Sequence, residues 1–196
     1  MTTQEENAYI QEVLAGNTQA YAYLIHRHKS LVYSLCLKIV KNKQDAEEVA
    51  QDVFLKAYQQ LANFKQASKF ATWLYKIAYN TALNKIKRKR VWLESIHHES
   101  DEHPTLQIED NTFEGQFELL RLEEKSKYIQ QAIKTLSEQD AVIITLFYFA
   151  ENNLEEIAEI TGIDKNNVKI KLHRARKKLY QVLDTLLSKE LESLVN

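Results

Sequence analysis

Residues 154–179 read LEEIAEITGIDKNNVKIKLHRARKKL, and this stretch decides the fold of the C-terminal part of the chain. Apolar residues recur at helical spacing on both sides of a single glycine, Gly162. Glycine readily takes the left-handed conformation that ends a helix, and Asp164 is suited to cap the helix that follows. The stretch therefore predicts a helix-turn-helix.

The second helix of this pair is basic on the side that faces away from the core. Between Lys165 and Lys178 the chain has seven lysines and arginines and no acidic residue. Such a helix can lie in a groove of DNA and contact phosphates on both sides. Many surface helices are also basic and amphipathic, so charge alone does not decide, but the turn and the helix pair together favour DNA binding. The outward-facing residues are Asn166, Lys169, Ile170, His173 and Lys177.

The rest of the chain is predicted to be helical as well. The 196 residues include three glycines and one proline, and apolar residues recur at a spacing of three to four. A chain of this length forms one domain or two small ones.

Cys36, the single cysteine, has no partner for an internal disulfide and is expected in the core. The start lacks a signal-peptide pattern and the longest apolar run, AVIITLFYFA, is too short to span a bilayer, so we expect a cytoplasmic protein.

Charges are segregated along the chain, although the formal net charge is only −1. Residues 53–93 contain nine lysines and arginines and no acid, whereas residues 94–118 contain eight acids and neither lysine nor arginine. Together with the helical spacing of the apolar residues, this layout predicts an all-α protein with two small helical domains. The domains are residues 1–92 and 119–196, and they are joined by a flexible acidic linker at 93–118. A metal site in the linker is the less favoured alternative, because a flexible segment fixes no ligand geometry. Its ligands would be His97, His98, Glu99, Asp101 and His103.

The segment at 70–90, FATWLYKIAYNTALNKIKRKR, is predicted to form a helix with a strip that reads nucleic acid. At about 100° per residue, a ring, amides and lysines fall side by side on this strip. A ring can stack on an unpaired base, an amide can bond to a base edge, and lysines can hold phosphates. Trp73 is equally well explained as a half-buried core residue. The strip consists of Trp73, Lys76, Asn80, Asn84 and Lys87.

The helix predicted at 45–61, DAEEVAQDVFLKAYQQL, has a mostly acidic polar face instead. Asp45 is expected to open this helix, with Glu48 as its capping partner. Because phosphates repel acidic side chains, the face is a candidate protein-binding surface. Acids at a helix start are, however, also favoured by the helix dipole, which stabilises the helix without any partner. The face consists of Glu47, Glu48, Gln51 and Asp52.

A further helix is predicted just before the helix-turn-helix. Ser137, with Asp140 three positions on, is suited to start it. Phe147, Tyr148 and Phe149 are predicted to pack this helix against the helix-turn-helix.

Motifs for catalysis are missing from the sequence. It contains no glycine-rich phosphate loop, no paired-histidine metal motif and no nucleophile elbow. We therefore expect a protein that is not an enzyme and that uses no cofactor, no metal and no small-molecule substrate.

Three of these segments, in the same order, resemble the extracytoplasmic-function (ECF) group of bacterial sigma factors. The segment at 45–61 resembles that family's core-polymerase-binding helix, and the segment at 70–90 resembles its helix for the minus-10 promoter element. TLSEQDAVIITLFYFAENNLEEIAEITGIDKNNVKIKLHRARKKL, at 135–179, resembles its minus-35 domain. The resemblance covers nearly the full chain. It implies a protein that binds core RNA polymerase, directs it to specific promoters and helps to melt the start region.

The resemblance also implies partners and roles for individual residues. The clamp coiled coil of the polymerase's largest subunit would be bound by Asp45, Glu48, Gln51, Asp52 and Phe54. The minus-10 element would be contacted by Asn63, Lys65, Lys69, Trp73, Lys76, Asn80, Asn84, Lys87 and Arg88. The minus-35 element would be contacted by Lys165, Asn166, Asn167, Lys169, Ile170, His173, Arg174 and Lys177. The other implied partners are the polymerase flap, promoter DNA and an anti-sigma factor, which in this family is often membrane anchored.

Two positions depart from the family's usual pattern. Asn84 stands where the family often has aspartate, and the recognition helix reads VKIKLHRAR where the family often reads VKSRLHRAR. The second change places Ile170 at a position usually held by a small polar residue. Both changes bear on the promoter sequence that is preferred, because they alter groups that face the DNA.

Two other classes of function remain open from the residues alone. A stand-alone DNA-binding regulator would use the same helix-turn-helix without contacting polymerase. Charge reversal at Glu48 and Asp52 separates these two functions, since only the sigma factor would lose polymerase binding. A single-stranded RNA-binding protein would use the aromatic, basic helix at 70–90, and predicts tight RNA binding by residues 1–92 alone.

Overall fold

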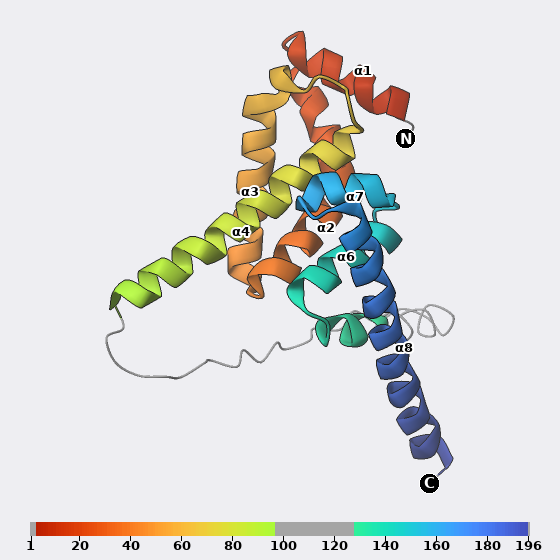
Figure 1. Ribbon diagram of the computed structural model, residues 1–196. Coiled ribbons are helices and arrows are strands. Elements are labelled where there is room, and N and C mark those ends of the chain that lie inside the picture. Colours follow the sequence, from red (N-terminus) through yellow and green to blue (C-terminus); the bar gives the residue numbers. More distant parts are fainter. Residues whose placement is uncertain (1–2, 97–127, 196) are drawn as a thin grey trace.

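The computed structural model describes residues 3–96 and 128–195, and every regular element in these two ranges is helical (Figure 1). The N-terminal half contains α1 (Thr3–Leu14), η1 (Thr18–Ala20), α2 (Tyr21–Val40), α3 (Lys43–Gln60), η2 (Leu61–Asn63) and α4 (Phe70–Ile96), where η marks a 3-10 helix. The C-terminal half contains a helix at 128–134, α6 (Glu138–Tyr148), α7 (Leu154–Thr161) and α8 (Lys165–Val195). The all-α prediction is confirmed. Residues 93–96, which were expected to begin the linker, are helical and form the end of α4. The rest of the expected linker, with the alternative metal site, lies outside the described residues.

The helices α2, α3 and α4 pack around the core of the N-terminal half. Each presents an apolar stripe at helical spacing, so that side chains such as Leu24, Val53 and Leu74 are fully buried. Burying a side chain of this size stabilises the folded state by about 1.5–3 kcal/mol. Between α1 and η1 the chain turns at Gly16, whose φ of 102° is readily accessible to glycine alone.

A buried polar network ties α1 to α2 and α4. The Glu6 carboxylate accepts a hydrogen bond from Nε of Arg27 at 2.6 Å and lies 3.1 Å from Nε2 of His28. Nδ1 of the same histidine lies 3.1 Å from the Tyr75 hydroxyl. Because Glu6, His28 and Tyr75 are all buried, these bonds replace the water that the groups lose on folding. Burial alone would raise the pKa of Glu6, but the hydrogen bond and charge of His28 and the charge of Arg27 outweigh it and lower that pKa.

The start of α3 differs from the prediction. The helix begins at Lys43, before Asp45, because Asn42 is its cap: Oδ1 of Asn42 accepts a hydrogen bond from the backbone N–H of Asp45 at 2.9 Å. Asn and Asp are caps of similar strength, so local sequence does not decide between these two positions. The Glu48 carboxylate forms an ion pair with Lys85 of α4 instead of serving as a capping partner.

The predicted helix-turn-helix is confirmed. Gly162 has a φ of 69° and ends α7 in the left-handed conformation. Oδ1 of Asp164 then accepts a hydrogen bond from the backbone N–H of Asn166 at 2.9 Å, at the start of α8. At the other end of α7, Asn153 and Glu156 form a capping box. The second helix is longer than its basic segment, and its C-terminal part extends away from the other helices (Figure 1).

The aromatic residues at the end of α6 follow the prediction only in part. Phe147 is partly buried, and Arg176 of α8 lies over the rings of Phe147 and Tyr148, 4.8 and 5.3 Å from their centroids. Phe149 is 50% exposed and lines a groove shared with α2, so the prediction that it packs against the helix-turn-helix is wrong. About half a turn of helix separates inward from outward positions, so three consecutive rings cannot all face one neighbour.

The two halves pack against each other. The helix α7 lies on α4 and α6 lies on α2, and buried residues of both halves join one apolar cluster (Figure 1). The loop before α4 is thereby placed close to α7, although the two segments are far apart in the sequence. None of the described helices combines the length and the apolar character that crossing a membrane requires.

Candidate functional site

One side of α4 carries a row of exposed polar side chains, which we call the α4 strip. It consists of Lys69, just before the helix, and of Trp73, Lys76, Asn80, Asn84 and Lys87. All are exposed except Trp73, which is half-buried. The Trp73 ring packs against the rings of Phe64 and Phe70, with centroids 5.3 and 5.7 Å apart. The structure thus brings the strip together as predicted, with Trp73 fixed at its edge by two other rings.

The loop between η2 and α4 contains the remaining candidates for nucleic-acid contact. Asn63 and Lys65 are exposed, and the Phe64 ring between them packs edge-on against Phe70 at 5.7 Å. Gln66 has a φ of 54°, an uncommon conformation for a residue other than glycine. The aromatic contacts hold this loop at the N-terminal end of the α4 strip.

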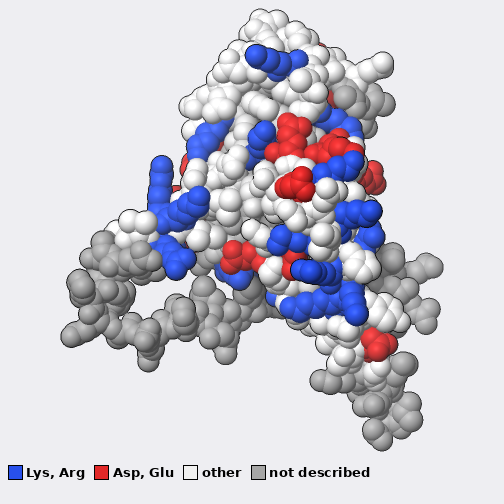
Figure 2. Space-filling view, in the orientation of Figure 1, with Lys and Arg blue, Asp and Glu red and all other residues white. Residues whose placement is uncertain are grey.

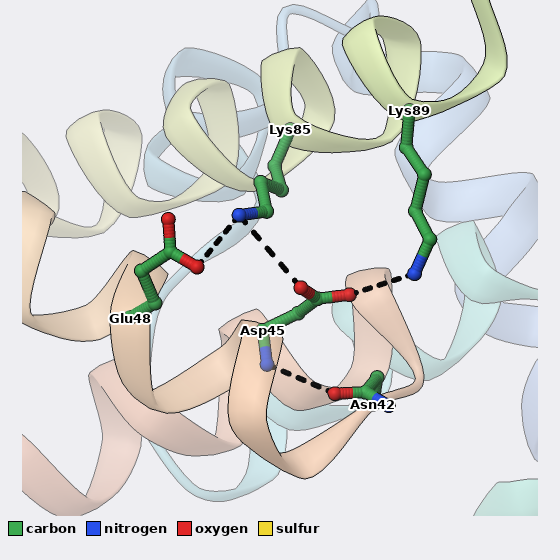
Figure 3. A network of polar contacts seen from close by, with 5 residues as sticks. All are labelled: Asn42, Asp45, Glu48, Lys85 and Lys89. Carbon is green, nitrogen blue, oxygen red and sulfur yellow. Dashed lines mark hydrogen bonds and ion pairs between the residues drawn. The ribbon is translucent and has the colours of Figure 1, made fainter. Parts of the chain in front are cut away.

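A groove between α3 and α4 contains a network of ion pairs (Figure 3). Nζ of Lys85 lies 2.7 Å from Glu48 and 3.7 Å from Asp45, and Nζ of Lys89 lies 3.0 Å from the other oxygen of Asp45. The hydrogen bond to Glu48 is the main cause of a raised Lys85 pKa. Sequence reasoning missed both lysines as partners of α3. The two lysines are four residues apart and the two acids are three apart, so each pair lies on one side of its helix. This spacing was the signal that could have predicted the contact.

The candidate polymerase-binding residues do not form a single surface. Asp45, Glu48 and Asp52 line the groove toward α4, whereas Gln51 is exposed outside it. Phe54 is partly buried against the core, and its backbone carbonyl accepts a hydrogen bond from the Tyr21 hydroxyl at 2.7 Å. Two exposed apolar residues of α3 were not predicted as site residues. They are Leu55 and Tyr58, which are 57% and 40% exposed.

The exposed side of α8 carries every residue predicted to contact the minus-35 element, and we call this surface the α8 face. Its residues are Lys165, Asn166, Asn167, Lys169, Ile170, His173, Arg174 and Lys177. Val168, Leu172 and Ala175 are buried on the opposite side. Ile170 is 47% exposed, so the departure from the family pattern lies on the surface. Lysine and arginine side chains gather over this part of the molecule in Figure 2.

Three cations of the basic segment contact other groups of the chain. Nζ of Lys178 donates a hydrogen bond to the Thr135 backbone carbonyl at 2.7 Å, and Arg176 covers the α6 rings. Lys165 forms an ion pair with Glu155 of α7. In the part of the chain that the structure describes, Lys169, Arg174 and Lys177 have no carboxylate within ion-pair distance.

Acidic residues of the C-terminal half contact the α4 strip. Nζ of Lys69 lies 2.9 Å from a Glu156 carboxylate oxygen, and Nζ of Lys76 lies 3.9 Å from Glu159. Burial alone would raise the pKa of Glu156, but hydrogen bonds from the Lys69 side chain, the Asn153 backbone and the Asn152 side chain lower it overall. Figure 2 shows acidic side chains gathered over α7 beside basic ones.

The described residues contain no group of three or more His, Cys, Asp or Glu side chains placed to hold a metal ion. Cys36 is buried, and burial raises the pKa of its thiol to about 12. A thiol in that environment stays protonated at neutral pH, which suits the predicted core position.

Comparison with known proteins gives two family matches that fall on the two halves. Residues 24–91 match the family described as Sigma-70 region 2, and residues 126–179 match Sigma-70, region 4. The first covers most of α2, all of α3 and most of α4, and the second covers α6, α7 and the basic part of α8.

Curated relatives match over nearly the whole chain. The ECF RNA polymerase sigma factor SigW of Bacillus subtilis is 33% identical over 180 residues, which are 90% of this chain and 96% of that protein. The RNA polymerase sigma-H factor of Pseudomonas aeruginosa is 30% identical over 95% of this chain and 98% of that protein.

Two solved structures share the fold. CnrH, solved in complex with the cytosolic domain of CnrY, has a TM-score of 0.60 at 21% identity, over 91% of this chain and 96% of that one. The sigma factor RpoE from Bartonella quintana, solved with the anti-sigma factor NepR, has a TM-score of 0.66 at 18% identity, over 84% of this chain and 96% of that one.

Proposed function

The chain belongs to the ECF family of RNA polymerase sigma factors, which direct core RNA polymerase to promoters, and we propose that its described helices divide this work among three surfaces. The α4 strip and the loop before it bind the minus-10 element. The α8 face binds the minus-35 element, and α3 binds the polymerase. One observation carries this proposal: two separate exposed polar helix faces occur in one chain, each within its own sigma-70 region.

The α4 strip suits a single strand better than a duplex. Asn80 and Asn84 are exposed and offer a donor and an acceptor each to the edges of unpaired bases. Extruding one base from the stack costs a few kcal/mol, and hydrogen bonds and ring contacts to that base can offset this cost. Binding energy therefore drives melting, and no covalent step is needed.

The α8 face suits duplex DNA. Its Lys169, Arg174 and Lys177 can contact phosphates on both sides of a groove, and His173 and Ile170 lie between them on the helix. Ile170 offers an apolar contact in place of a small polar one, and a thymine methyl group is the base feature that fits it. The upstream preference of this chain is therefore expected to differ from that of relatives with serine at this position.

We propose that α3 binds the polymerase through two adjoining parts. One contains the exposed Gln51 and Asp52, and the other contains the groove residues Asp45 and Glu48. Gln51 and Asp52 are exposed, and so is their neighbour Leu55, which gives this part of α3 an apolar centre with a polar rim. Phe54 supports the surface from behind, because its ring is partly buried. The protein then works where the polymerase works, in the cytoplasm, without an enzymatic activity, cofactor or small-molecule substrate of its own.

An anti-sigma factor is the third proposed partner. Both solved structures of similar fold contain a bound second protein, and in one it is named an anti-sigma factor. Such a partner would hold the chain inactive by covering the polymerase-binding and DNA-binding surfaces.

Run-off transcription with core polymerase across genomic promoters tests this function. Asp52→Lys should abolish polymerase binding and transcription while leaving duplex binding by the α8 face unchanged, because α3 and α8 carry separate surfaces. The matched control is Glu12→Lys, an exposed charge reversal on α1. If the wild-type chain with core polymerase protects and transcribes no promoter at low salt, the proposal is wrong.

A further inference from the structure

The polar contacts between the two halves are arranged in the same way. Lys41 of the N-terminal half pairs with Glu138 at 3.0 Å, and Nζ of Lys38 donates to the Gln130 side chain at 3.2 Å. The pairs Lys69–Glu156 and Lys76–Glu159 repeat this pattern at α4 and α7. In each of these contacts the lysine comes from the N-terminal half and the acceptor comes from the C-terminal half.

The α7 acids also face the loop that precedes α4. A shallow groove is lined on one side by Gln66, Ser68 and Lys69, and on the other by acids of α7. Those acids are Glu155, Glu156 and Glu159. The proposed function places a phosphate backbone at this loop and at the first turns of the strip. Carboxylates of the chain itself therefore occupy the position of that backbone.

Glu156 is held in this position by its own helix. Its Oε2 accepts hydrogen bonds from the backbone N–H of Asn153 at 2.9 Å and from the Asn152 side chain at 3.3 Å, while Oε1 faces Lys69. The Glu156 side chain is 14% exposed, so water screens this ion pair less than a pair on open surface. An anion that is already oriented competes with a phosphate without further loss of side-chain freedom.

We propose that in the polymerase-free chain α7 acts as an intramolecular substitute for promoter DNA. Glu156 and Glu159 neutralise Lys69 and Lys76, and α7 covers the loop and the N-terminal part of the α4 strip. The minus-10 surface becomes available when polymerase binding separates the two halves. This inference rests on the proposed function, because it takes the α4 strip to be the minus-10 surface.

As a consequence, the polymerase-free chain has a low affinity for single-stranded DNA. Lys69 and Lys76 cannot contact a phosphate and a glutamate at full strength at the same time, so strand binding must displace α7. The α8 face keeps Lys169, Arg174 and Lys177 available, and it binds duplex DNA in either arrangement. Coupling between polymerase binding and minus-10 binding then follows from the geometry of a single interface.

The test compares the full-length wild type with the double variant Glu156→Gln/Glu159→Gln, without polymerase. Glutamine keeps the capping box at the start of α7, so the helix should be preserved. Each of the two ion pairs contributes up to about fivefold, and we expect the double variant to bind a labelled single-stranded minus-10 oligonucleotide about tenfold more tightly. The matched control is Glu12→Gln/Asp184→Asn, which changes the net charge equally at exposed positions away from the interface.

A second readout uses the native pair itself. A carbodiimide joins a lysine amine to an adjacent carboxylate, and mass spectrometry should find a Lys69–Glu156 cross-link in the free chain that is lost in the complex with core polymerase. The inference is overturned if the double variant binds no more tightly than the control, or if the cross-link persists unchanged in the polymerase complex. Transcription by the wild-type chain with core polymerase distinguishes this failure from failure of the proposed function.

Discussion

The basic residues of α4 and of α8 differ in what they contact. On α4, carboxylates lie 2.7 to 3.9 Å from the ammonium groups of Lys69, Lys76, Lys85 and Lys89. On α8, the described residues place no carboxylate within ion-pair distance of Lys169, Arg174 or Lys177. The two helices have a similar excess of positive charge in the sequence. In the folded chain, three cations of α8 remain available, whereas the four lysines of and before α4 are already paired with carboxylates.

This difference separates two ways of binding an anion. A helix with free cations releases counterions when it binds phosphate, so its affinity depends steeply on salt. A helix with paired cations must first break its ion pairs, so its affinity depends on whatever displaces the acids. The α8 face is therefore suited to anchor the chain on duplex DNA, and the α4 strip to act in a second, conditional step.

The largest effect is expected in the N-terminal half, where the buried polar network contains Glu6. Glu6→Ala leaves His28 buried without its anionic partner, and removing one member of a buried pair costs about 3 kcal/mol. We expect the free energy of unfolding, measured by urea denaturation, to fall by about that amount, while the α8 face keeps its affinity for duplex DNA wherever the variant is folded. Gln11→Ala, also on α1 but exposed, should change stability by less than about 0.5 kcal/mol.

The pH dependence of stability tests the same network. The pKa of Glu6 is lower in the folded state than its ordinary value of 4.5. Its contribution is therefore present above that value and is lost as the pH falls through the folded-state pKa. Thermal unfolding below about pH 4.5 should show a steeper loss of stability for the wild type than for Glu6→Gln. Parallel curves for the two proteins would exclude an ionised Glu6 as a source of stability.

The next effect concerns the free cations of α8. The variant Lys169→Gln/Arg174→Gln/Lys177→Gln removes three phosphate contacts, each of which contributes about 0.9 to the slope of log affinity against log salt. The slope for minus-35 duplex DNA, measured by fluorescence anisotropy, should become shallower by about 2.7. Lys29→Gln changes an exposed charge on α2 and should leave the slope unchanged. An unchanged slope in the triple variant would show that these cations do not contact phosphate.

The sequence predicted the helices well because their signals are local. Gly162 and Asp164 set the turn between α7 and α8 through their own backbone preferences, and the structure places both as expected. The start of α3 was mispredicted because Asn42 and Asp45 are competing caps of similar strength. Phe149 was mispredicted because an apolar residue at the end of a helix can face either side.

The candidate site was predictable as a set of exposed residues and not as a set of contacts. Periodicity placed Asn80, Asn84 and Lys87 on one side of α4, and the structure shows all three exposed. It could not reveal that Lys69 meets Glu156, because residues so far apart in the sequence leave no local signal of their contact. Which cations are paired is decided by tertiary packing, and so the difference between α4 and α8 emerges only in the folded chain.

A smaller effect concerns the turn of the helix-turn-helix. A Cβ at Gly162 would meet nothing within 4 Å, so Gly162→Ala should cost stability only through its φ of 69°, by about 1 kcal/mol. Amide hydrogen exchange should report the loss in α7 and α8 while protection in α3 is retained. Gly162→Asn is the matched control, since asparagine tolerates the left-handed conformation and should recover much of the loss. Equal losses for alanine and asparagine would show that the left-handed φ is not the cause of the lost stability.

The smallest effect is expected when one lysine of α4 loses its ion pairs. Lys85→Gln removes the ion pairs to Glu48 and Asp45, and a partly exposed pair of this kind contributes about 0.2–1 kcal/mol. The pKa of Lys85 is raised, so this contribution is fully present below the ordinary value of 10.5 and is lost only as the pH rises through the folded-state pKa. The urea midpoint at neutral pH should therefore fall for Lys85→Gln and stay constant for Lys87→Gln, an exposed lysine on the same helix. If both variants lose the same stability, the net charge of α4 matters more than its pairing, and the distinction from α8 would not hold at this groove.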